Sequence, residues 1–286
     1  MKRNLAKLVV VFAASGLIAL ADDAEGSFER ALTVSGPVDL DVQTGAGRLD
    51  VRASGSGRVS IHGVIRAREH FGGQSAQDKV RALESNPPIE QNGNVVRIGQ
   101  IHDPDLRRNI SISYEVLVPA DTKLHSSTGS GTVVVEGLRG PVSADTGSGT
   151  VTISRIEDGV RLHTGSGRVE LDSIQGNVDA HTGSGPIHGT GIKGRIVADT
   201  GSGGIHLEQT GAADIEARAG SGEITLRVPQ QAAFNLRAHT GSGGIEVTRP
   251  MTVRGTFGHH DLEAKVGGGG NTTVDLSTGS GKIRID

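Results

Sequence analysis

Apolar and polar residues alternate in short runs along most of the chain, and the same order of runs recurs. In one unit, Val151 and Ile153 alternate with polar neighbours, Ile156 follows, and Val160 and Leu162 alternate again. The next unit repeats this order from Val169 onward. Alternation with a period of two predicts half-buried β-strands, so each unit is expected to hold two short strands joined by turns.

A Gly-Ser-Gly triplet, usually preceded by Thr, marks each unit and sets its length. The triplets begin at Gly129, Gly147, Gly165, Gly183, Gly201, Gly220, Gly241 and Gly279. The first five starts are evenly spaced, the next two intervals are slightly longer, and the last is about twice as long. This long interval predicts one further, degenerate unit between residues 255 and 270. A period this regular is typical of solenoids, in which like residues of successive coils stack on one another.

Glycine suits these corners because a tight turn between short strands needs backbone angles that glycine adopts without a Cβ clash. A phosphate-binding loop is the competing interpretation, but it would need a Lys-Ser or Lys-Thr pair and a following helix, which the triplets lack. A second corner is expected where Leu138, Ile156, Ile174 and Ile192 recur with the same period. We therefore predict an all-β fold, a right-handed parallel β-solenoid (β-helix) built from 18-residue, two-strand T-G-S-G coils.

The region before Gly129 is less regular. Alternation at residues 38–42, 49–51 and 59–64 predicts further strands, which we expect to form the first coils. The spacing of apolar residues over 74–85, ended by Asn86-Pro87-Pro88, predicts one short amphipathic helix inserted near the N-terminal end.

These patterns together predict a single β-solenoid domain over residues 22–286. It would contain irregular N-terminal coils over 22–120 and regular repeats over 121–286. A domain boundary near residue 120 is the alternative. Charges alternate on the last strand at Lys282, Arg284 and Asp286, and we expect them to discourage end-to-end polymerisation, which leaves a monomer or a weak end-to-end oligomer.

The N-terminus has the features of an export signal. Lys2, Arg3 and Lys7 precede an apolar run, residues 8–20, that is too short to span a bilayer. We predict a signal peptide over residues 1–21, with an uncleaved anchor as the alternative, and no membrane span in the mature chain. The mature protein is then expected in the periplasm, elsewhere in the cell envelope or outside the cell.

Composition narrows the classes of function. The chain has no cysteine, which excludes disulfides and thiolate metal sites, and its formal net charge of −3 does not favour nucleic-acid binding. Tyr114 is the only tyrosine, tryptophan is absent, and neither a carboxylate pair nor a G-x-S-x-G elbow stands out. We therefore predict a protein that is not an enzyme, with no catalytic residues and no cofactor. A β-helical carbohydrate-active enzyme remains an alternative.

One row of ionisable residues suggests a metal site. The position before each corner threonine, or before Ala219 where alanine replaces it, is occupied in turn by Asp145, His163, His181, Asp199, Arg218 and His239. Strands of stacked coils lie about 4.8 Å apart, so His163 and His181, with Asp145 or Asp199 beside them, are the candidate ligands. The interpretation that we adopt is a solvated polar column without metal. A calcium-binding β-roll would need aspartate in its turns, and these turns lack it.

Two other rows of stacked residues are candidate binding surfaces. The corner threonines, a conceivable ice-binding row, are Thr128, Thr146, Thr164, Thr182, Thr200 and Thr240. Alternation points them inward, which makes them a poor template. An outward column on the other strand of each coil is expected at Thr152, Glu170, His188 and His206.

Several segments carry a resemblance to a known family. They are the export signal, the strands around residues 28–42, the stretch from Asn86-Pro87-Pro88 to Ile98, the strand over residues 111–119 and the T-G-S-G coils. Together they resemble the bacterial putative adhesin family, exported proteins of unknown function with β-strand repeats. The resemblance implies a β-helical fold, a location outside the cytoplasm and no catalytic residues.

The function expected from this reasoning is an exported, non-catalytic binding or scaffold protein of the cell envelope. It would use the side faces of the solenoid, and its partner would be an envelope protein or a glycan. A metal-binding envelope protein that uses the stacked His/Asp column is the alternative.

Overall fold

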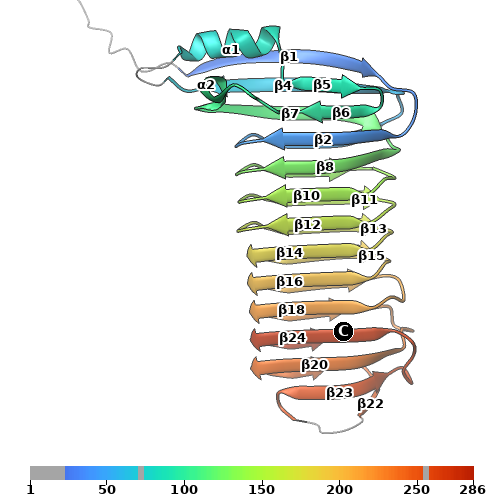
Figure 1. The fold of residues 1–286 in the computed structure, drawn as a ribbon. Coiled ribbons are helices and arrows are strands. Elements are labelled where there is room, and N and C mark those ends of the chain that lie inside the picture. Colours follow the sequence, from blue (N-terminus) through green and yellow to red (C-terminus); the bar gives the residue numbers. More distant parts are fainter. Residues whose placement is uncertain (1–22, 70–73, 254–257) are drawn as a thin grey trace, which may run out of the picture.

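The computed structural model describes residues 23–69, 74–253 and 258–286, which form two long β-sheets stacked into a solenoid (Figure 1). The predicted signal peptide, residues 1–21, lies outside the described residues. No helix in the described part of the chain is long and apolar enough to cross a membrane. The parallel solenoid with a short N-terminal helix confirms the predicted fold class.

Each coil contributes one strand to each sheet. Sheet I runs in spatial order β1 (Ala24–Thr33), β4 (Arg58–Ala67), β7 (Ile110–Pro119), β3 (Leu49–Ser54), β9 (Val133–Glu136), β11 (Val151–Ile156), β13 (Val169–Ile174), β15 (Ile187–Ile192), β17 (Ile205–Gln209), β19 (Ile224–Arg227), β25 (Ile283–Ile285) and β21 (Ile245–Val247). Sheet II runs β22 (Met251–Val253), β23 (Asp261–Val266), β20 (Phe234–Ser242), β24 (Thr273–Ser280), β18 (Ile215–Ser221), β16 (Ile196–Ser202), β14 (Val178–Ser184), β12 (Val160–Thr164), β10 (Val142–Thr146), β8 (Thr122–Thr128), β2 (Val38–Thr44), β6 (Val95–Ile98) and β5 (Ile89–Asn92).

The regular coils stack in the register that the period of the sequence predicts. Val151 pairs with Val169, and Val169 pairs with Ile187. The apolar side chains of the alternating pattern point inward and form one continuous core, while their polar neighbours face solvent. The corner residues Leu138, Ile156, Ile174 and Ile192 are all fully buried. In the next coil Gln209 takes this corner, and its amide donates to the backbone carbonyls of Gly194 and Ala213.

The T-G-S-G corners are built from backbone stacked on backbone. A Cβ placed on Gly167 would lie 1.9 Å from the carbonyl oxygen of Gly149 in the preceding coil. No side chain fits at that distance, so the second glycine of the triplet is required by the stacking itself. The corner threonines point inward as predicted and are buried. The hydroxyl of Thr200 donates to the carbonyl of Gly185 over 3.0 Å, whereas the buried hydroxyls of Thr128, Thr146 and Thr164 have no hydrogen-bond partner in the described part of the chain.

The N-terminal end departs from the predicted coils. The prediction that residues 59–64 form a parallel coil is wrong, because β4 pairs antiparallel with both β1 and β7. Each of these three strands is 10 residues long, and their backbones pair with one another over almost the whole of that length as an antiparallel unit. The other edge of β7 pairs parallel with β3 and joins this unit to the coils. The coil of β2 and β3 lies between that of β6 and β7 and that of β8 and β9, out of sequence order.

The predicted helix is α1 (Ala76–Ser85), and it covers the outer edge of sheet I (Figure 1). Ser75 caps its first turn by accepting from the amide of Asp78, which explains the later start than the predicted 74. Glu84 accepts a hydrogen bond of 3.0 Å from the backbone N–H of Ser27 in β1. The helix thus provides a hydrogen-bond acceptor for the edge strand β1, whose backbone would otherwise be open to pairing with another strand. A short helix, α2 (Pro104–Arg107), precedes β7.

The C-terminal end also differs from the prediction. The degenerate unit expected between residues 255 and 270 is not a parallel coil, because β23 runs antiparallel to β20 and to β22. The final coil, β24 and β25, does not end the stack, since it lies between β18–β19 and β20–β21. Lys282 and Arg284 therefore do not lie at a free end of the stack, where they were expected to discourage polymerisation. They face Glu246 of β21, with which Lys282 forms an ion pair.

Candidate functional site

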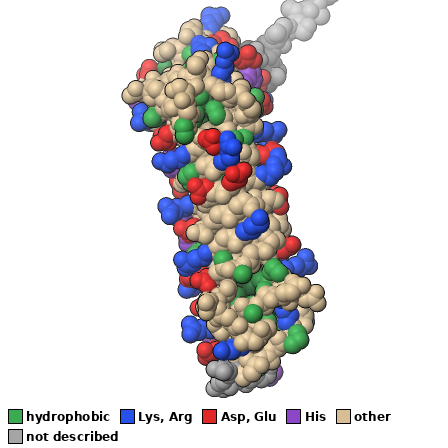
Figure 2. Space-filling view, turned by 90° about the vertical axis from the view of Figure 1, so that its right-hand side faces the viewer, with side chains coloured by type: hydrophobic (Ala, Val, Ile, Leu, Met, Phe, Trp, Pro, Cys, Tyr) green, Lys and Arg blue, Asp and Glu red, His purple; other side chains and the backbone are tan. Residues whose placement is uncertain are grey.

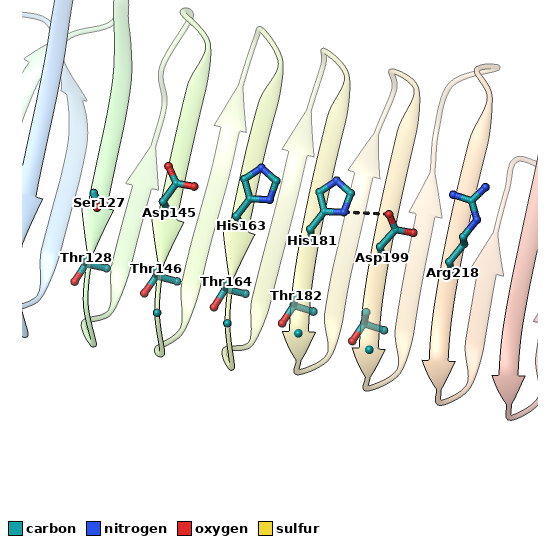
Figure 3. A pocket seen from close by; sticks show the side chains of 15 residues that line it. Ser127, Thr128, Asp145, Thr146, His163, Thr164, His181, Thr182, Asp199 and Arg218 are labelled. Carbon is teal, nitrogen blue, oxygen red and sulfur yellow. Dashed lines mark ion pairs between the residues drawn. The ribbon is translucent and has the colours of Figure 1, made fainter.

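A row of polar side chains crosses six neighbouring strands of sheet II just before the T-G-S-G corner (Figure 3). We call it the polar row: Ser127, Asp145, His163, His181, Asp199 and Arg218. Each member pairs in register with the next, because each occupies the same outward position of its coil. A shallow groove of about 790 Å³ follows the row, and the corner threonines and glycines line its other side.

The middle of the polar row is held by contacts between its own side chains. The rings of His163 and His181 stack with their centroids 5.1 Å apart. Nδ1 of His181 lies 3.0 Å from Oδ2 of Asp199, and Nε2 lies 2.6 Å from Oδ1 of Asp179. Both nitrogens of this imidazole are thus engaged by carboxylates, which orients the ring along the surface.

Asp179 belongs to a second outward row on the same face, two residues earlier in each coil. It contains His125, Ser143, Arg161, Asp179, Val197 and Glu216. Arg161 contacts Asp179 over 3.4 Å, and Glu216 forms ion pairs with Arg195 and Arg218. The charges of this face are therefore largely paired with one another.

Sheet I carries the outward column predicted at Thr152, Glu170, His188 and His206, which stand in register on β11, β13, β15 and β17. The rings of His188 and His206 meet edge to face with centroids 4.8 Å apart. Partial burial and the charges of His206 and Arg168 lower the pKa of His188 below its ordinary 6.5.

Residues 89–286, which contain all the regular coils and both faces described above, match the model of the Toastrack DUF4097 family. The chain belongs to the Toastrack family. This match confirms the expected membership of a putative adhesin family of unknown function. No curated protein matches this Toastrack chain.

Two solved structures are similar to the Toastrack chain at low identity. A putative adhesin from Bacteroides fragilis NCTC 9343 is 14% identical, with 91% of this chain and 97% of that chain covered and a TM-score of 0.47. A putative cell adhesion protein from Clostridium sporogenes ATCC 15579 is 12% identical, with 92% and 99% covered and a TM-score of 0.31.

The four candidate metal ligands of this Toastrack protein, Asp145, His163, His181 and Asp199, do lie on consecutive strands as expected. They stand in a line rather than around a common point (Figure 3). Within the ranges that the structure describes, no group of three His, Asp or Glu side chains is arranged to hold a metal ion. The geometry therefore supports an extended contact surface better than a metal centre.

A second hollow of the Toastrack chain, of about 600 Å³, lies where the antiparallel unit meets the first coil. Its lining includes Asp50, Arg52, His62, Glu115 and Leu117. Arg52 Nε donates to Asp50 Oδ1 over 2.7 Å, and this bond raises the pKa of Arg52. Sequence reasoning missed this hollow because its residues come from four strands that the out-of-order N-terminal coils bring together.

Replacement of His206 should shift the pKa of its neighbour His188 on sheet I. In His206→Gln we expect the pKa of His188 to rise, because one repelling charge is lost, yet to stay below 6.5, because burial is the larger cause. The unfolded chain binds this proton more readily, so the stabilising contribution of His188 is present above pH 6.5 and is lost as pH falls below it. NMR titration of the His188 ring measures the shift.

The remote variant His239→Gln is the control for this titration, since His239 lies in sheet II near the C-terminal end of the stack, where it pairs with Asp261. It should leave the His188 pKa unchanged. An unaltered His188 pKa in His206→Gln would show that the two rings do not interact.

Proposed function

We propose that this protein is an exported, non-catalytic binding or scaffold protein of the cell envelope that presents a side face of the solenoid to its partner. The observation that carries the proposal is the groove along the polar row, which extends over six in-register strands. Because each strand adds about 4.8 Å, such a groove suits an elongated ligand more than a compact one.

The contacts of the groove favour binding over catalysis. A nucleophilic mechanism needs a hydroxyl beside a base that can take its proton. Here the nitrogens of His181 face the carboxylates of Asp179 and Asp199. The hydroxyl of Thr200, at the edge of the groove, donates to a backbone carbonyl instead. These groups shape a polar surface, and their mutual bonds hold it rigid before a ligand arrives.

The charge distribution favours a partner recognised by shape and hydrogen bonds. Figure 2 shows acidic and basic side chains interspersed on the side of the molecule opposite the T-G-S-G corners. The outward rows of sheet II also carry both signs, since Asp199 and Arg218 stand next to each other in the polar row and Arg161 and Asp179 do so in the row beside it. A field of one sign, as nucleic-acid binding requires, is therefore not what the groove face presents. An envelope protein or an envelope glycan fits a surface of this kind.

Export is supported by the basic residues and the apolar run within residues 1–21. Expression of the full chain in a bacterial host, followed by N-terminal sequencing of the exported protein, tests this part of the proposal. We expect a mature chain that begins at Asp22. Retention of the full chain in the cytoplasm would contradict export.

The binding role is tested by an in-frame deletion of residues 151–186, two complete coils that carry β11 to β14. The deletion joins Thr150 to Ile187 and keeps the register, because β15 then pairs with β9 as β11 does. It removes two of the six strands of the groove. We expect capture of the envelope partner in a crosslinking pull-down to weaken at least tenfold, equivalent to about 1.4 kcal/mol.

A matched variant separates the groove from the length of the solenoid. His163→Gln with His181→Gln alters the middle of the polar row and keeps every coil. Both variants should retain the β-sheet circular dichroism of the parent. Weaker capture by both variants supports the groove as the binding face, whereas equal capture by all three folded proteins would refute it.

A further inference from the structure

The last coil of the chain fills a gap between two coils that are neighbours in sequence. After β18 and β19 the chain continues directly to β20 and β21, yet these two coils do not touch through their strands. In sheet II β24 lies between β18 and β20 (Figure 1), and in sheet I β25 lies between β19 and β21. We call this gap the slot and the segment from Thr273 to Asp286 the C-terminal coil.

The slot fits the C-terminal coil on both of its walls. In sheet II, Thr278 pairs with Ala219 on one side and with Thr240 on the other. In sheet I, Ile283 pairs with Ile224 and with Ile245. One wall is the edge of the parallel strands β18 and β19, and the other is the free side of β20, whose second neighbour β23 is antiparallel, together with β21. The backbone N–H and C=O groups on both walls would be unpaired without the coil. Four apolar side chains of the coil complete the core: Val274, Leu276, Ile283 and Ile285.

Side-chain contacts make the fit specific to this coil. Lys282 forms an ion pair with Glu246 in the wall strand β21, and Arg284 Nη2 lies 3.9 Å from the same carboxylate. At the start of the coil, the backbone N–H of Thr273 donates to Asp214 Oδ1 over 2.8 Å. A generic T-G-S-G coil would satisfy the backbone of the slot but not these contacts.

A glycine hinge leads into the coil. Residues 267–270 are four consecutive glycines between β23 and β24, and Gly267, Gly268 and Gly269 have φ values of 62°, 90° and 79°. Left-handed angles of this kind are freely available to glycine, so the segment can change direction at little cost. The hinge must cross over β20 to bring the coil into the slot.

We propose that the C-terminal coil is exchangeable, so that the slot of one copy receives the C-terminal coil of a second copy and a dimer forms. The contacts in the slot are the same whichever copy supplies the coil, since register, buried side chains and ion pairs are all unchanged. Only the path of the glycine hinge differs between the monomer and the dimer. Exchange of an identical element across a hinge is a low-cost route to such a dimer.

The absence of cysteine from the sequence allows a direct test with two single-cysteine variants. Thr225→Cys marks β19 in the wall, and Arg284→Cys marks its register partner in the C-terminal coil. Equal amounts of the two proteins are unfolded, mixed, refolded at high concentration and treated with a short bismaleimide. A covalent product containing one copy of each variant is expected, because only exchange brings these cysteines from different copies together.

The control pair is Glu170→Cys with His188→Cys, which are register partners on β13 and β15. These coils are consecutive both in sequence and in space, so they have no slot between them. The mixed product of this pair measures random collision. A Thr225/Arg284 product no more abundant than the control product would overturn the proposal.

Shortening the hinge should shift the equilibrium toward the dimer. Deleting Gly267–Gly270 leaves two residues between β23 and β24, too few to cross β20 without strain, and strained hinges favour exchange. Light scattering should show a dimer for this variant under conditions in which the parent is a monomer. A folded variant that stays monomeric would count against exchange as strongly as a negative crosslink.

Discussion

Gly167→Ala should destabilise the solenoid by roughly 3 kcal/mol or more, although it adds a single methyl group. The new Cβ would lie 1.9 Å from the carbonyl oxygen of Gly149 and 2.8 Å from the hydroxyl oxygen of Thr164. Because the first of these atoms belongs to the backbone of the stacked coil, it can move only if the corner itself opens. Chemical denaturation followed by circular dichroism measures the loss in the free energy of unfolding.

Gly244→Ala is the control, because Gly244 lies directly after the last glycine of a T-G-S-G corner, one position later in its coil than Gly167. A Cβ at this position meets no heavy atom within 4 Å. Its free energy of unfolding should stay within about 0.5 kcal/mol of the parent. Equal losses in the two variants would show that loss of glycine flexibility, and not the contact between coils, determines the cost.

Removal of residues 271–286 should release the whole C-terminal end of the solenoid, including residues that precede the cut. The deleted segment supplies the only parallel partner that β20 has in the described part of the chain, and it buries Val274, Leu276, Ile283 and Ile285. Four such side chains correspond to roughly 6 to 12 kcal/mol of lost burial, taken as an upper bound. We expect hydrogen exchange in residues 234–247 to approach the rate of unfolded peptide, while residues 133–209 keep their protection.

The corresponding cut in an ordinary repeat protein would remove one terminal repeat and leave the neighbour in place. The comparison variant is therefore an internal deletion of residues 151–186, which removes two coils without opening a gap. It should leave the exchange of residues 234–247 unchanged. Retained protection of β20 in the truncated chain would mean that β20 re-pairs directly with β18.

The regular middle of the fold was predictable because its period and its alternation agree. Val151, Val169 and Ile187 are evenly spaced along the chain and each heads an alternating run, so both the register and the inward face followed from the sequence. The corner threonines were placed inward by the same reasoning, and they are buried. In this region the alternation within each strand and the period between coils predict the same arrangement of strands.

The ends were not predictable because a period does not say which coil lies beside which. The C-terminal coil has the same Gly-Ser-Gly triplet as the coils on either side, and its pattern fits any position in the stack. A triplet does not guarantee a corner either. Gly55-Ser56-Gly57 forms an exposed turn between β3 and β4, and a Cβ on Gly55 or Gly57 would meet nothing within 4 Å.

The candidate site was predictable in part. The polar row could be assembled from one position per unit, and the structure places Asp145, His163, His181 and Asp199 in line as expected. The partner that orients His181 was missed, because Asp179 belongs to the row two residues earlier. Both residues point outward from β14. Because residues two positions apart lie on the same face of a strand, the sequence alone could have predicted that Asp179 lies beside His181.

Because the out-of-order coils are confined to the two ends, the number of regular coils between them can vary. Each end is a closed assembly whose strands pair among themselves and offer the middle a single parallel coil, β8–β9 at one end and β18–β19 at the other. A gene duplication that adds one regular unit between them would lengthen the side faces by about 4.8 Å and disturb neither end. The length of the solenoid can thus change in steps of one coil, while the structures at its two ends stay the same.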